Sequence, residues 1–267
     1  MAVSFNTIPQ KIYTPLFYAE VDNSAANTTT DSMQALLIGP MLTTGTATAS
    51  EVTYVSSAEQ AAELFGHGSL LHRMVKAYRD QDSSGTLYCL PLADPESGVA
   101  ATKTVTFTGT ATGAGTVNLY IGYELVQAGV DTGDTVSDIA GAVMAAVNAN
   151  TDLPVTATAS EGVLTLTAKH KGLVSEDFSV NLNLLGASNG QVLPAGISAV
   201  VAKGTAGTGV PDIEKAFAAL KDEPFEFIGL LYSDKTALDA SKAAMTQRWA
   251  YDVQLYGHVY TCKRDTV

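Results

Sequence analysis

The stretch KTVTFTGTATGAGTVNLYIG (residues 103–122) contains two runs in which apolar and polar residues alternate. Alternation with a period of two is typical of half-buried β-strands. The same pattern returns in PVTATAS (154–160) and GVLTLTAK (162–169), and residues 166–185 contain one further strand pattern. Because Thr, Gly, Ala and Val dominate from Ala100 to Val201, this region is predicted to be rich in short β-strands.

One helix is expected among these strands, in DTVSDIAGAVMAAVNAN (134–150), with Asp134 as its N-cap. Apolar residues recur there at every fourth position, on one helical face: Ile139, Val143 and Val147. The glycine-rich segment 109–116 lies between two β-patterned runs and is interpreted as a hairpin turn. These patterns predict a compact α+β module whose strands cover one face of a single helix.

The flanking regions have a different, α/β pattern. Before the β-rich region, strands are predicted at 34–39 and 85–92, with two helices between them. Ser57 caps the first helix with Gln60 three residues later, and Ser69 caps the second. After it, the pattern predicts a helix that begins at Pro211–Asp212 and a strand in FEFIGLLY (225–232). A second helix is predicted in DKTALDASKAAMTQRWA (234–250) and a last strand in YGHVYTCK (256–263).

This change of pattern predicts the domain organisation. Residues 34–95 and 204–267 are expected to form one discontinuous α/β core domain, interrupted by an inserted β-rich α+β domain at 96–203. The turn-rich segments 93–98 and 203–212 mark the boundaries. Two tandem domains are the alternative, but neither flanking region alone has enough strands for a sheet covered on both faces. The fold class is therefore α/β and α+β.

Residues 1–33 are predicted to form an extended N-terminal arm and a hinge. Pro9 and Pro15 exclude a central strand, and the polar segment 22–31 follows. The arm nevertheless contains residues that favour extended chain and that we expect to contact another subunit: Phe5, Ile8, Ile12, Tyr13, Phe17 and Tyr18.

Composition excludes several classes of protein. The chain has 267 residues, 46% of them hydrophobic, which is ample for a packed core. Its formal charge of −12 and its lack of a basic cluster argue against binding to nucleic acid. No apolar run approaches the roughly 20 residues of a membrane-spanning helix. Cys89 and Cys262 both lie in apolar, strand-like runs and are expected to be buried free thiols, as in a reducing compartment.

No catalytic, cofactor or metal site is predicted. His67 is interpreted as a polar loop residue, His72 as solvent-facing, His170 as an exposed strand end and His258 as a buried core residue, and none has metal-ligand spacing. Ser69 only loosely resembles a nucleophile elbow, and capping explains it better. The glycine-rich segment 204–209 precedes a helix but lacks the lysine of a phosphate-binding loop. An enzyme is not indicated.

The quoted motifs resemble a known family. SFNTIP (4–9), PLFYAEVDNSAAN (15–27), ELFGHGSLLHRMVKAY (63–78) and LYCLPLAD (87–94) are similar to the N-terminal half of Mu-like phage tail sheath proteins. The segment DEPFEFIGLLYSD (222–234) resembles the start of the family's subtilisin-like core domain, and the middle region resembles its outer β-rich insertion. The likeness extends over essentially the whole chain.

This resemblance implies a structural role. Sheath subunits of the family form stacked hexameric rings around a tail tube, and contraction drives the tube through the host envelope. The protein would assemble in the host cytoplasm and reside in the virion tail, with other sheath subunits and the tube protein as partners. Terminal arms of the family add strands to neighbouring subunits, which suits the arm at residues 1–33.

Two expectations concern the length. The chain stops shortly after a strand, without a closing helix, so we expect it to be an N-terminal portion of a longer protein with an incomplete core. Since the family's members run further, we also expect this chain to be mostly monomeric. Other functions stay open at this point: a β-rich module on an α/β scaffold that binds a surface glycan or a protein, and, more weakly, a hydrolase completed by residues outside this chain.

Overall fold

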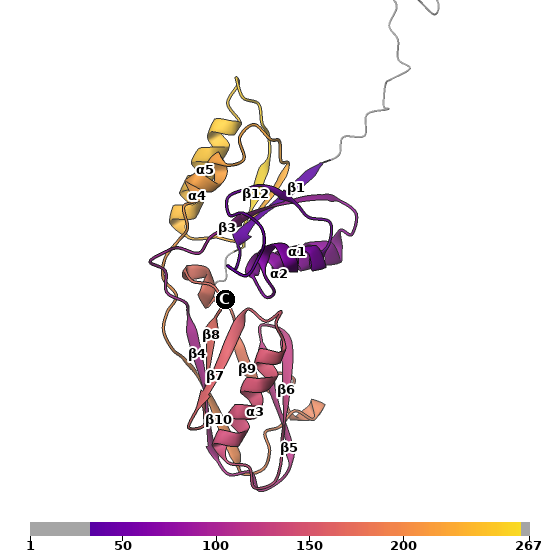
Figure 1. Ribbon diagram of the computed structural model, residues 1–267, viewed down its shortest axis with the longest axis vertical. Coiled ribbons are helices and arrows are strands. Elements are labelled where there is room, and N and C mark those ends of the chain that lie inside the picture. Colours follow the sequence, from indigo (N-terminus) through magenta and orange to yellow (C-terminus); the bar gives the residue numbers. More distant parts are fainter. Residues whose placement is uncertain (1–32, 263–267) are drawn as a thin grey trace, which may run out of the picture. The chain divides into compact units, whose positions relative to one another are not determined.

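The computed structural model describes residues 33–262, which all belong to one unit beginning at Met33 (Figure 1). The predicted arm, with Phe5, Ile8, Ile12, Tyr13, Phe17 and Tyr18, lies outside the described residues. The predicted α/β and α+β class is confirmed for the described part. Its strands form two groups. We call the group within residues 34–92 and 227–260 the core, and the group within residues 102–203 the insert.

The core contains a five-stranded sheet in the order β12-β11-β1-β3-β2. Neighbouring strands are parallel except at the β2–β3 pair. The strands are β1 (Gln34–Pro40), β2 (Thr53–Tyr54), β3 (Thr86–Leu92), β11 (Phe227–Leu230) and β12 (His258–Tyr260). After Gln34, the central strand β1 is an unbroken apolar run because both of its faces are buried, as is usual in a parallel sheet.

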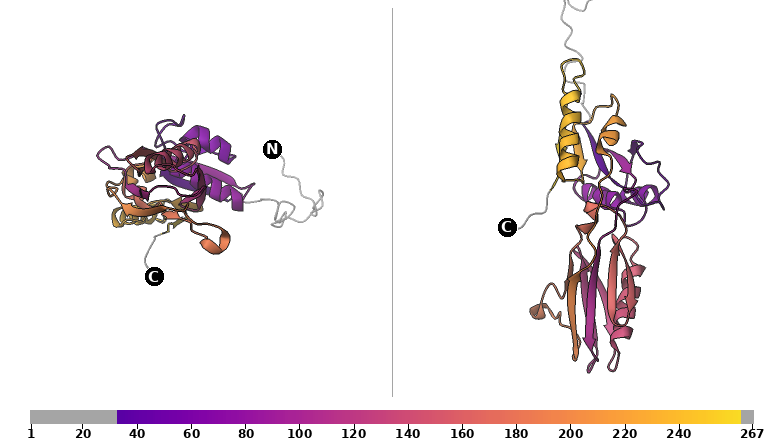
Figure 2. Two further views of the ribbon diagram at one scale, coloured as in Figure 1. Left: turned by 90° about the horizontal axis from the view of Figure 1, so that it is seen from below. Right: turned by 90° about the vertical axis from the view of Figure 1, so that its left-hand side faces the viewer.

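Helices cover both faces of this sheet (Figure 2). Helices α1 (Ala58–Phe65) and α2 (Leu70–Gln81) pack on the side chains of Ala35 and Leu37. Helices α4 (Ile213–Ala218) and α5 (Lys235–Arg248) pack on the opposite face, on Leu36 and Ile38. The predicted N-caps of α1 and α2 are confirmed, since Ser57 and Ser69 each accept a hydrogen bond from a backbone N–H inside the first turn. Helix α4 follows Asp212, which is its N-cap.

The insert is a sandwich of two antiparallel sheets, β10-β4-β8-β7 and β6-β5-β9. Its strands are β4 (Thr102–Gly109), β5 (Gly115–Ile121), β6 (Glu124–Val130), β7 (Val155–Ser160), β8 (Val163–Ala168), β9 (Val180–Leu182) and β10 (Ile197–Lys203). Helix α3 (Val136–Ala149) contacts the edge strands β6 and β7, one from each sheet. A short 3₁₀ helix follows β8, at Leu173–Glu176, and another follows β9, at Ala187–Asn189.

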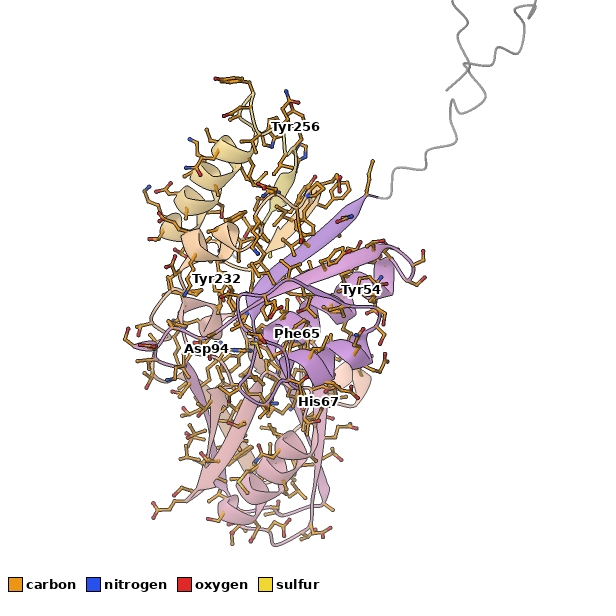
Figure 3. The ribbon with its side chains drawn as sticks, turned by 45° about the horizontal axis from the view of Figure 1, so that its top comes forward. Tyr54, Phe65, His67, Asp94, Tyr232 and Tyr256 are labelled. Carbon is orange, nitrogen blue, oxygen red and sulfur yellow. The ribbon has the colours of Figure 1, made fainter. Side chains whose placement is uncertain are left out.

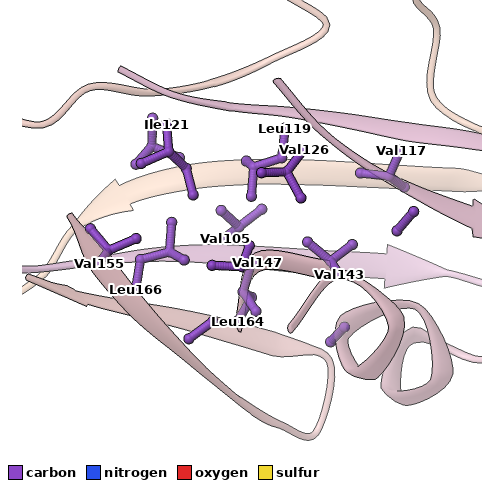
Figure 4. Close-up of a cluster of buried hydrophobic side chains, with 14 of the residues drawn as sticks. Val105, Val117, Leu119, Ile121, Val126, Val143, Val147, Val155, Leu164 and Leu166 are labelled. Atoms are coloured by element: carbon purple, nitrogen blue, oxygen red, sulfur yellow. The ribbon is translucent and has the colours of Figure 1, made fainter. Parts of the chain in front are cut away.

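Fully buried side chains from both sheets and from α3 meet inside the insert (Figure 4). They include Val105, Leu119, Leu164 and Val147. All buried members of this cluster lie between Ala101 and Ile197, so the insert has a hydrophobic core of its own. Its extent as a separate domain, residues 96–203, remains a prediction.

Two local expectations for the insert were wrong. The segment after Gly109 is not a hairpin, because β4 and β5 belong to different sheets and the chain crosses between them. The N-cap of α3 is Thr135 and not Asp134, because Thr135 and Asp138 exchange hydrogen bonds in a capping box, while Asp134 accepts from Asp131 N.

Candidate interaction surface

Strand β12 forms one edge of the core sheet. Within residues 33–262 it pairs with β11 alone, so its outer side carries main-chain groups without a strand partner. The backbone N–H of His258 donates to the carbonyl oxygen of Glu226, on the inner side. Because successive N–H groups of a strand point in opposite directions, the N–H of Val259 points outward. Such an edge can accept a further strand.

A row of aromatic rings lies along this edge, and we call it the aromatic strip: Phe227, Trp249, Tyr256, His258 and Tyr260. Trp249 lies edge-on to Tyr256 and to His258, with ring centroids 5.4 and 5.8 Å apart. Tyr260 continues the row, 6.4 Å from His258 and 6.3 Å from Phe227. Between 43% and 56% of Phe227, Trp249, Tyr256 and Tyr260 is exposed. Clustered exposed aromatic rings are typical of surfaces that bind another molecule.

The turn before β12 holds the strip in place. Trp249, the C-cap of α5, donates a hydrogen bond from Nε1 to the carbonyl oxygen of Gly257 at 3.1 Å. A Cβ at Gly257 would lie 2.2 Å from the carbonyl oxygen of Phe225, so the close approach requires glycine. Figure 3 shows Tyr256 near the end of β12, away from the insert. A groove of about 550 Å³ adjoins the strip and is lined by Lys242, Met245 and Thr246 of α5 and by residues 257–259.

Two predictions for this end of the chain were wrong. His258 is exposed and not buried, because it lies on a short strand at the edge of the sheet. Cys262 is exposed as well, whereas Cys89 is buried as expected, and both are free thiols. Burial raises the pKa of the Cys89 thiol well above its ordinary value. The sequence signal for the strip was the spacing in YGHVY, which places Tyr256, His258 and Tyr260 on one side of a strand.

A second cluster of polar contacts joins the core to the insert, at the helix break FGHGS (65–69). Gly66 and Gly68 both have positive φ, +89° and +76°. A Cβ at Gly68 would lie 2.4 Å from the carbonyl oxygen of Leu153 and 2.7 Å from that of Thr151. Glycine therefore lets the core backbone touch the backbone of the insert.

Charged side chains surround this contact. His67 Nδ1 lies 2.9 Å from Asp152 Oδ1, and this hydrogen bond is the main cause that lowers the pKa of Asp152. Lys169 of the insert donates to the carbonyl oxygens of His67 and Thr151, at 3.2 and 2.6 Å. Figure 3 shows His67 and Asp94 where the core meets the insert.

Two histidines at this junction are buried, contrary to expectation. His72 was predicted to face solvent, but its ring lies under the helix break, where Nδ1 accepts from Gly68 N at 3.4 Å; burial lowers its pKa. His170 was predicted to be exposed, but it is 1% exposed because the end of β8 meets α2 and the residue Asp94. His67 is exposed on its loop, as predicted.

The described residues contain no group of three or more His, Cys, Asp or Glu side chains arranged to hold a metal ion. Within residues 33–262, no helix is long and apolar enough to cross a membrane.

Comparison with known proteins relates the chain to one family. Residues 96–198 match the phage tail sheath protein β-sandwich domain, in agreement with the sandwich of the insert. The chain is 35% identical over 268 aligned positions to the Mu-like prophage FluMu tail sheath protein of Haemophilus influenzae, covering 100% of this chain and 54% of that protein. The chain thus spans about half the length of the curated relative that it matches.

Two solved structures are more distant. The sheath tail protein of Listeria innocua is 11% identical, covering 85% of this chain and 46% of that one, with a TM-score of 0.32. The sheath tail protein of Desulfitobacterium hafniense is 13% identical, covering 93% and 52%, with a TM-score of 0.34. The family model and the Haemophilus relative do not favour a glycan- or protein-binding module, and they identify the chain as a relative of Mu-like phage tail sheath proteins, with their β-sandwich domain at residues 96–198.

Proposed function

We propose that this chain is a structural part of a contractile phage tail sheath, which polymerises as stacked rings around a tail tube and contracts to drive the tube through the host envelope. The observation that carries the proposal is the 35% identity to the FluMu tail sheath protein over the entire chain. The proposed partners are other copies of the subunit and the tube protein, and the proposed location is the virion tail after assembly in the host cytoplasm. The role is mechanical and not catalytic.

Assembly by strand addition is the proposed mode of contact. The arm of one copy, through Phe5, Ile8, Ile12, Tyr13, Phe17 and Tyr18, would pair with the open edge of β12 in another copy. Main-chain hydrogen bonds would supply the affinity, and alternate side chains would pack on the aromatic strip and set the register. The outward N–H of Val259 and the half-exposed rings of Trp249 and Tyr260 support this use of the edge.

Electron microscopy tests the function. We would compare the 267-residue chain with the protein encoded by its complete gene. Tubes or stacked rings from the complete protein are expected, and deletion of residues 1–22 should abolish them while leaving circular dichroism unchanged. Particles that stay small and monodisperse at high concentration would contradict the proposal.

A proline in β12 tests the mode of contact separately. Val259→Pro removes the outward N–H but leaves the bond from His258 N to Glu226 O on the β11 side, and proline is tolerated on edge strands. We expect Val259→Pro to prevent tube formation by the complete protein. Val259→Thr is the matched control, since it keeps both the N–H and the β-branched shape. Normal tubes from the proline variant would show that the edge of β12 is not the contact.

A further inference from the structure

His170 uses both nitrogens of its buried ring. Nδ1 lies 2.9 Å from Asp94 Oδ1, and Nε2 lies 3.1 Å from the backbone nitrogen of Leu70. A backbone N–H can only donate, so Nε2 must accept and carries no proton. The remaining proton is therefore on Nδ1 and is donated to Asp94. These contacts define a neutral ring in one tautomer.

The three residues come from different parts of the fold. Asp94 follows β3, in the segment that leads from the core into the insert, and its Oδ2 also accepts from Lys171 N at 2.9 Å. His170 follows β8 of the insert, and Leu70 is the first residue of α2 in the core. The ring of His170 thus connects the insert to the N-terminus of a core helix.

The surroundings determine what a second proton would do. Arg73 from α2 and Asp177 from beyond the 3₁₀ helix line the small cavity beside the ring, about 90 Å³, together with Leu70 and Phe178. Asp94 is the hydrogen-bond partner of the ring on the other side. Burial raises the pKa of the nearby Tyr232, and the charge of Asp94 raises it further. Lys169 and Lys171 flank the histidine in sequence. If Nε2 also carried a proton, two donors, Nε2–H and the backbone N–H of Leu70, would face each other and repel. The N-terminal end of α2 is also the positive end of the helix dipole, which adds to this repulsion. Asp94 would still accept the hydrogen bond from Nδ1.

We propose that His170 is an acid-sensitive latch between the insert and the core. In the neutral state it accepts from Leu70 and holds the insert against α2. When Nε2 takes up a proton, that bond is lost, the insert stays attached through Asp94, and its contact with the core loosens. The inference is independent of the proposed sheath function, because it depends on the contacts of His170 alone.

Amide hydrogen exchange in the 267-residue chain tests the latch, with Leu70 N–H as the reporter. Between pH 8 and pH 5, protection of this amide, corrected for intrinsic exchange, is expected to fall on the order of tenfold relative to Cys89 in β3. His170→Gln is the matched variant, since its Oε1 can accept from Leu70 but cannot take up a proton in this range. Its protection should not change with pH. His67→Gln, at the exposed histidine of the same junction, should behave as the unaltered protein.

Nitrogen chemical shifts of the His170 ring provide a second measurement that needs no variant. We expect an unprotonated Nε2 and a protonated Nδ1 at neutral pH. The opposite tautomer would overturn the proposal. So would a pH-independent Leu70 amide, an equal loss of protection in His170→Gln, or a ring that stays neutral until the protein unfolds.

Discussion

Gly68 lies against the backbone of Leu153 so closely that a Cβ on the glycine would be 2.4 Å from the leucine carbonyl oxygen. The first residue belongs to a helix break in the core and the second to the insert. The motif FGHGS therefore has a physical role in this fold: it lets two parts of the structure meet through backbone atoms.

Gly68→Ala should destabilise the protein. The residue has φ +76°, where a side chain is strained, and its new Cβ would collide with backbone that cannot move aside without displacing the insert. We expect a loss of about 2 kcal/mol or more in the free energy of unfolding, measured with urea. Gly141→Ala in α3 is the control, because its Cβ would meet nothing within 4 Å. That variant should gain about 0.5–1 kcal/mol from helix propensity, and an equal loss in both would contradict the explanation.

The insert should fold alone. All buried members of its hydrophobic cluster come from its own residues, from Ala101 to Ile197. We expect a protein of residues 96–203 to unfold cooperatively and to show dispersed amide signals. Leu164→Ala should then cost about 2–5 kcal/mol, because the side chain is fully buried between the sheets. Val200→Ala, on a residue 66% exposed, should change stability by less than about 0.5 kcal/mol. A molten fragment would show that the insert depends on the core.

Asp138 should make a small contribution to stability that depends on pH. The Thr135 hydroxyl donates to its carboxylate, as does the Thr135 backbone N–H, and these bonds lower the pKa of Asp138 below its ordinary value. A pKa that is lower in the folded than in the unfolded state stabilises the protein at pH values above the unfolded pKa, which is about 4. This contribution is lost as the pH falls through the folded pKa. Stability should therefore decline more steeply below about pH 4 in the unaltered protein than in Asp138→Asn. Urea unfolding at several pH values measures this. Glu96→Gln, at an exposed carboxyl before β4, should keep the steeper decline.

The aromatic strip should matter for assembly more than for folding. Tyr260→Ser removes a half-exposed ring next to Phe227 and His258. We expect it to reduce tube formation by the complete protein at least tenfold while lowering the free energy of unfolding by no more than about 1 kcal/mol. Tyr251→Ser is the control, since that ring is 91% exposed and lies outside the strip. Equal assembly of the two variants, counted by electron microscopy, would remove the strip from the proposed interface.

Patterns confined to neighbouring residues were read correctly from the sequence. Ser57 and Ser69 cap their helices as predicted, because a cap depends on a side chain and an N–H three residues away. The apolar run at residues 34–40 became a central parallel strand, because burial on both faces selects apolar residues at every position. One cap was predicted at the wrong residue. Thr135, and not the predicted Asp134, is the N-cap of α3 because it exchanges hydrogen bonds with Asp138.

The environment of each side chain was decided by tertiary structure. Period-two alternation tells which residues share a side of a strand, but not whether that side meets another sheet, a helix or water. His170 and His258 both follow or occupy strands, yet one is buried against α2 and the other is exposed on an edge. Local pattern thus indicated the α/β and α+β class and most of the strands and helices, although β2, β6 and β10 were not predicted. Three other features depended on contacts between residues distant in sequence, which no local pattern encodes. These are the pairing of the strands, the contact between the helix break and the insert, and the exposure of the aromatic rings.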